Sequence, residues 1–162
     1  MIPEIRAKFN AAFTPEKYEL FKEGIRSRYN YKPLFREAET PFFIPHILKE
    51  RLLEACDLIN ETVVRKDIKS FTQGSLYDVS LIVPNEDEHT TFLQMDFGIT
   101  LDEKGDPFPQ LIEIQGFPSV YFFQYVVSQA YKDHYDIPEN MTCFFNGYNA
   151  ETYKKLMYDI IV

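Results

Sequence analysis

Two alternating segments separated by a turn constrain this 162-residue chain more than any other feature. Residues 91–100 (TFLQMDFGIT) and 110–115 (QLIEIQ) alternate between polar and apolar side chains, which is typical of β-strands. Between them, residues 102–107 (DEKGDP) combine the acids, glycine and proline of a tight turn. The pattern therefore predicts a β-hairpin over residues 91–116.

Closing the turn symmetrically predicts how the two strands pair. Asp96 then lies opposite Glu113, the glutamines at 94 and 115 lie opposite each other, and Phe97 lies opposite Ile112. Because side chains alternate between the faces of a strand, this register gathers the apolar residues on one face. The other face then holds a group that we call the acid–amide cluster: Gln94, Asp96, Glu113 and Gln115.

Two ionised carboxylates directly opposite each other on a hairpin destabilise it. Exposure to water, a shared proton, or a cation bound by both acids and a neighbouring amide oxygen would offset this repulsion. Asp96, Glu113 and the side-chain carbonyl of Gln115 are oxygen ligands of the kind that Mg²⁺ prefers. A metal site is one hypothesis, and the solvent face of an ordinary surface hairpin is the other.

Helical patterns lie on both sides of the hairpin. Thr14-Pro15-Glu16 predicts the start of a helix, with the Thr14 hydroxyl accepting a hydrogen bond from a first-turn amide. Pro45 opens the longest helix, over residues 45–66, with one apolar face. A further helix over residues 118–132 is rich in aromatic residues. We expect an α+β fold in a single domain, 1–162: a small, mainly antiparallel sheet centred on the hairpin, with helices 45–66 and 118–132 against its apolar face.

The last predicted helix, residues 149–162, ends inside an apolar run with neither a C-terminal glycine nor a basic last turn. This ending predicts the N-terminal part of a longer protein or of an obligate assembly. The partner would be the remainder of that longer chain, or a second copy bound through the aromatic helix 118–132.

Charge and hydropathy exclude several classes of protein. A formal net charge of -8 opposes binding to nucleic acid. No run of 18 apolar residues predicts a membrane span, and the N-terminus lacks the pattern of a signal peptide, so we expect a cytoplasmic protein. Cys56 and Cys143 are expected to be buried free thiols, and the three scattered histidines do not predict a zinc site.

The hairpin strands, QMDFGIT at 94–100 and LIEIQGFPS at 111–119, resemble the metal-binding strands of ATP-grasp ligases. They are most similar to those of the circularly permuted kind related to glutathionylspermidine synthase. The resemblance implies that Asp96, Glu113 and Gln115 bind Mg²⁺ under the phosphates of ATP, with Gln115 in place of the usual asparagine. Gln94 takes the place of a phosphate-binding arginine, and Ser119 fits a helix-cap or substrate-lining role.

The resemblance implies the metal- and nucleotide-binding part of a ligase that joins a carboxylate to an amine through an acyl phosphate. We expect no turnover from this chain alone. Two alternatives stay open: a non-catalytic binding or assembly module that uses helix 118–132, and a glycoside-type hydrolase in which Asp96 and Glu113 act as acid and base.

Overall fold

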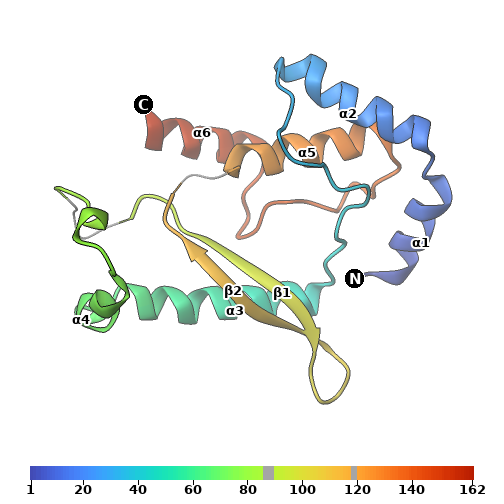
Figure 1. Cartoon of the computed structure of the whole chain (residues 1–162). Helices are drawn as coiled ribbons and strands as arrows, with labels where there is room; N and C mark the ends of the chain where they lie inside the picture. The colour runs from blue at the N-terminus through green and yellow to red at the C-terminus, as the bar shows by residue number, and fades with distance from the viewer. Residues whose placement is uncertain (86–89, 118–119) are drawn as a thin grey trace. The chain divides into compact units, whose positions relative to one another are not determined.

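The computed structural model describes residues 1–85, 90–117 and 120–162. The fold is α+β, as predicted, and combines helices with a two-stranded antiparallel sheet (Figure 1). In chain order the elements are α1 (Pro3–Ala12), α2 (Pro15–Tyr29), α3 (His46–Val63), α4 (Ile68–Thr72), the short 3-10 turns η1 (Gln73–Ser75) and η2 (Val79–Leu81), β1 (Gln94–Leu101), β2 (Pro107–Gln115), α5 (Tyr121–His134) and α6 (Ala150–Ile161).

The chain forms two compact units. Unit 1 combines both ends of the chain, Met1–Ile44 and Ser119–Val162, and unit 2 is the middle segment, Pro45–Pro118. The predicted hairpin lies in unit 2, together with α3.

Unit 1 is built where α2 packs against α5. Aromatic rings fill its core: Phe21 stacks on Tyr131 and Phe9 stacks on Tyr135, each pair with ring centroids 4.5 Å apart. Thr14 caps α2 as predicted, because its hydroxyl accepts a hydrogen bond from the backbone N–H of Lys17. The buried core residues are Phe9, Tyr18, Phe21, Ile25, Phe43, Val126, Ala130, Tyr131 and Tyr135.

Close packing between α2 and α5 requires a glycine at one position. A Cβ atom on Gly24 would lie 2.7 Å from Cε1 of His134. The His134 ring is held in this place by a hydrogen bond between its Nδ1 and the carbonyl of Ala130, and by an edge contact with Phe21. Any larger side chain at Gly24 therefore has to displace the imidazole.

The aromatic helix expected over residues 118–132 is α5. It packs against α2 inside unit 1, and the hairpin belongs to unit 2. Tyr125, Val126 and Tyr131 are buried there, so the aromatic residues that left this helix with little polar face belong largely to the core of unit 1.

The prediction for the long helix is confirmed. In unit 2, α3 packs against β2, and Leu48 on its apolar face is fully buried. This helix supports the hairpin, because a two-stranded sheet alone is marginally stable in water.

Both cysteines are free, as expected, but the prediction that both are buried was wrong. Cys56 on α3 is half-buried, and burial raises the pKa of its thiol. Cys143 is exposed, because the segment between α5 and α6 turns the neighbouring Phe144 inward toward Tyr125 and Tyr153 instead.

Candidate functional site

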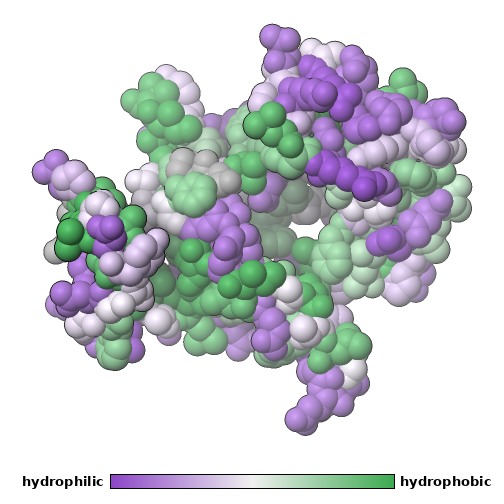
Figure 2. All heavy atoms as spheres, in the orientation of Figure 1, coloured by the Kyte–Doolittle hydropathy of each residue, from purple (hydrophilic) through white to green (hydrophobic). Residues whose placement is uncertain are grey.

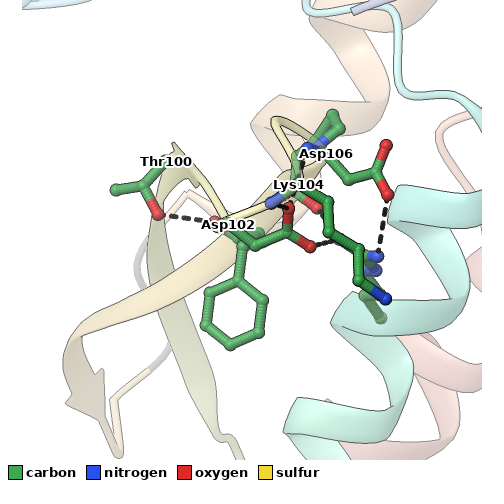
Figure 3. Close-up of polar contacts among 7 residues, drawn as sticks. Thr100, Asp102, Lys104 and Asp106 are labelled. Carbon is green, nitrogen blue, oxygen red and sulfur yellow. Dashed lines mark hydrogen bonds and ion pairs between the residues drawn. The ribbon is translucent and has the colours of Figure 1, made fainter.

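The turn that joins β1 to β2 is fixed by the side chain of Asp102. Its carboxylate accepts hydrogen bonds from the backbone N–H groups of Lys104 and Asp106, both at 2.9 Å (Figure 3). Gly105 has a φ of 82°, which favours glycine, and donates its N–H to the carbonyl of Asp102 at 2.9 Å. The N–H of Asp106, helped by that of Lys104 and by the charge of Arg51, lowers the pKa of the Asp102 carboxyl.

Arg51 connects this turn to α3. Its Nη1 donates to the carbonyl of Pro107 at 2.5 Å and to Oδ2 of Asp102 at 3.3 Å, and its Nη2 lies 3.7 Å from Oδ2 of Asp106. No sequence pattern predicted a role for this arginine. Arg51 lies in a helix and far along the chain from the turn, so its sequence context does not indicate that it contacts the turn.

The predicted register of the acidic residues is confirmed. Asp96 is paired with Glu113 and Gln94 with Gln115, so all four members of the acid–amide cluster lie on one face of the hairpin. Asp96 is half-buried and Glu113 is exposed.

The predicted pairing of Phe97 with Ile112 was wrong. The register shifts between Asp96 and Phe97, and Phe97 is paired with Leu111 instead. One extra residue on β2, Ile112, forms a β-bulge, which turns its side chain onto the face of the acid–amide cluster. Ile112 lies there against Gly98, within 3.6 Å of the position that a Cβ atom would take, and is 68% exposed. Figure 2 shows hydrophobic and hydrophilic residues mixed over the surface in view.

Amide N–H groups offset the repulsion between the two acids. Nε2 of Gln94 donates to Oδ1 of Asp96 at 3.1 Å. Nε2 of Gln115 donates to Oδ2 of Asp96 at 3.3 Å and also to Oε1 of Glu113, so a single amide bridges both carboxylates. Water, a shared proton and a cation were the expected ways to offset the repulsion, and this neutral bridge was not expected.

Neither acid of the cluster forms an ion pair within the described ranges, and Arg51 contacts the two acids of the turn instead. Bridging by amides leaves both negative charges in place, because an amide is neutral. The cluster therefore keeps two adjacent carboxylates whose charge is balanced by no basic side chain of the described residues.

The donor atoms of the cluster fit a hard cation. Among described residues, no group of three or more His, Cys, Asp or Glu side chains could hold a metal, so a site here consists of two carboxylates completed by amide oxygens and water. Rotating the side-chain amide of a glutamine by half a turn exchanges the positions of its NH₂ group and its carbonyl oxygen. Nε2 of Gln94 faces Asp96, whereas its Oε1 is buried and has no hydrogen-bond partner in the described structure.

Ser119, the remaining predicted site residue, lies outside the described residues. Within the described residues, no helix is both long enough and apolar enough to cross a membrane. No family model, curated protein or solved structure matches the chain.

Proposed function

We propose that the acid–amide cluster binds Mg²⁺ through the carboxylates of Asp96 and Glu113 and the side-chain carbonyl of Gln115. One observation carries this proposal: the two acids are directly paired across the hairpin with no basic side chain of the described structure on either of them. A divalent cation replaces the repulsion between the carboxylates by attraction to both.

The strand motifs support a more specific role, as the metal-binding part of an ATP-grasp-like carboxylate–amine ligase. QMDFGIT and LIEIQGFPS supply an acid on one strand and an acid followed by an amide on the next. Gln94 stands where such ligases carry an arginine, so this chain offers the phosphates a neutral amide. In this proposal Gln94 and Ser119 contact phosphate or substrate.

Each residue of the cluster has a separate task in this proposal. Asp96, half-buried and already accepting two N–H groups, is the better ordered ligand. Glu113 is exposed and provides the second carboxylate. The Nε2 atom of Gln115 bridges the two acids, and rotating the amide puts its oxygen in that place. When bound, Mg²⁺ neutralises charge on the triphosphate and orients it. The other contacts to ATP come from the remainder of a longer protein, and the chain is inactive on its own.

Isothermal titration with MgCl₂ tests the proposal, first alone and then with ATP present. We expect saturable binding by the parent chain and loss of binding in Asp96→Asn and Glu113→Gln. Glu103→Gln is the matched control, because it removes one charge from the exposed turn of the same hairpin. Equal binding by the parent and both cluster variants, or an equal loss in Glu103→Gln, would contradict the proposal by showing that only the overall charge attracts the ion.

A further inference from the structure

The hairpin has two outer edges whose backbone groups point away from the β1–β2 ladder. Asp102 donates its N–H to the carbonyl of Asp106, which makes these two residues a hydrogen-bonded pair. Such pairs alternate along an antiparallel ladder with pairs whose N–H and C=O groups face outward. The pairs Leu101–Pro107, Ile99–Pro109 and Phe97–Leu111 are therefore of the outward-facing kind.

The outer edge of β2 is blocked. Pro107 and Pro109 occupy outward-facing positions but have no N–H to donate. The carbonyl of Pro107 already accepts from Arg51, and the bulge at Ile112 interrupts the edge further along. Prolines and bulges of this kind prevent a further strand from pairing.

The outer edge of β1 has none of these protections. Its outward-facing groups belong to Met95, Phe97, Ile99 and Leu101, each of which has an N–H and a carbonyl. No hydrogen bond between backbone groups in the described structure reaches these four residues from outside the hairpin. Edge strands without a proline, a charge or a bulge at such positions accept a further strand readily.

We propose that β1 pairs antiparallel with β1 of a second copy of this chain, about a two-fold axis at Gly98. The sequence of the strand is self-complementary in this register. Phe97 lies opposite Ile99 of the second copy, and Met95 lies opposite its Leu101, so aromatic and branched side chains pair across the axis. The result is a four-stranded sheet with both acid–amide clusters on the same face.

The acidic residues of the strand favour this register over registers centred on neighbouring residues. Centring the axis on Asp96 would place the two Asp96 side chains opposite each other, and centring it on Ile99 would place Asp96 opposite Asp102. Centring it on Phe97 leaves Leu101 unpaired. With the axis at Gly98, all four outward-facing residues are paired, and Asp96 faces Thr100 of the second copy.

A disulfide cross-link between the Gly98 positions of the two copies would report this register. Across the axis the two Gly98 residues form a pair without hydrogen bonds, in which Cα atoms lie about 4.5 Å apart, near the lower end of the range for a disulfide. A Cβ atom at Gly98 makes only ordinary contacts with Ile112, at 3.6 and 3.8 Å, so Gly98→Cys is tolerated.

The first experiment oxidises Gly98→Cys with glutathione disulfide in a Cys56→Ser, Cys143→Ser background. Two thiols, one from each copy, form the disulfide while the glutathione disulfide is reduced to two thiols. We expect a covalent dimer on a non-reducing gel. Gln110→Cys is the matched control, because Gln110 is the residue paired with Gly98 on β2, away from the axis, and should give none.

The second experiment measures the dissociation constant of the parent dimer by sedimentation. Ile99→Pro removes one outward-facing N–H from β1 of each copy and is expected to weaken the dimer by about tenfold or more, without breaking the hairpin ladder. Leu111→Pro makes the same change on the edge of β2 and should leave the constant unchanged. Far-UV circular dichroism checks that both variants remain folded.

A pair of charge variants tests the register without cysteines. Thr100→Lys places an ammonium opposite Asp96 of the second copy and should tighten the dimer, whereas Thr100→Asp should weaken it. Both variants lose the same hydrogen bond from Thr100 to the carbonyl of Phe108, so the difference between them reports the charge. A parent chain that stays monomeric at its highest soluble concentration, or a dimer indifferent to Ile99→Pro, would overturn the proposal.

Discussion

Replacing Arg51 with alanine is expected to release the turn of the hairpin from α3. The guanidinium donates to the carbonyl of Pro107 at 2.5 Å and contacts the carboxylates of Asp102 and Asp106 (Figure 3). Arg51 is half-buried, and its side chain is 27% exposed, so solvent only partly competes for these contacts. Losing them should raise the frequency at which the turn opens.

The hydrogen bond to the Pro107 carbonyl sets the size of the effect. A hydrogen bond from a charged donor contributes about 1.5–3 kcal/mol, whereas the ion pair to Asp106, whose side chain is 52% exposed, adds little. A loss of about 2 kcal/mol corresponds to a roughly 30-fold increase in local opening. Arg51→Met, which keeps the apolar stem of the side chain, should lose nearly as much if hydrogen bonding rather than packing holds the turn.

Hydrogen exchange at the backbone N–H groups of Asp102 and Gly105 measures this opening directly, because both groups are hydrogen-bonded within the turn. Lys49→Ala is the control, since Lys49 lies on the same helix and its ion pair is with the adjacent Glu50. Exchange rates in Arg51→Ala that equal those in Lys49→Ala would refute the assigned role.

Three further predictions follow from other contacts. Gly24→Ala should lower the free energy of unfolding in urea. In a His134→Ala background, where the added methyl has room, the same substitution should raise it by about 1 kcal/mol. A change of the same sign in both backgrounds would contradict the close approach of Gly24 to His134. Below about pH 4, stability should fall as the pH drops through the lowered pKa of Asp102, and Asp102→Asn should remove this part of the pH dependence; an unchanged profile would argue against it. A thiol reagent should label Cys143 before Cys56, whose pKa is raised by burial, and equal rates would disagree with the structure.

The register of the acids was predicted from strand alternation and from symmetric closure of the turn near Gly105, and both pairs of the cluster are confirmed. The residues next to the turn pair one residue out of that register, as in Phe97 with Leu111, and the bulge at Ile112 restores it at Asp96. The capping of α2 by Thr14 was predictable for a similar reason, since the hydroxyl and the helix start are adjacent in the chain.

The bulge at Ile112 could not be predicted in the same way. The extra residue in β2 puts Ile112 and Glu113 on the same face, and this break in the alternation becomes visible only when the two strands are paired. The neutral bridge made by Gln115 was missed because its amide can present either a donor or an acceptor, and the sequence does not choose between them.

Packing between distant segments was the other source of error. The apolar pattern of α5 predicted that the helix would be buried, but not that α2 would be the helix that covers it. The contact between Arg51 and Pro107 likewise depends on how α3 packs against β2, for which neither segment carries a local signal.

Paramagnetic broadening by Mn²⁺, a stand-in for Mg²⁺ that shares its preference for oxygen ligands, tests the metal site most directly. In a ¹⁵N-labelled chain, low concentrations of Mn²⁺ should first broaden the amide signals of Asp96, Glu113 and Gln115, and excess Mg²⁺ should restore them. Asp96→Asn should abolish this local pattern. Broadening that is spread evenly over the acidic surface, or that persists unchanged in Asp96→Asn, would contradict the assignment of a cation to the acid–amide cluster.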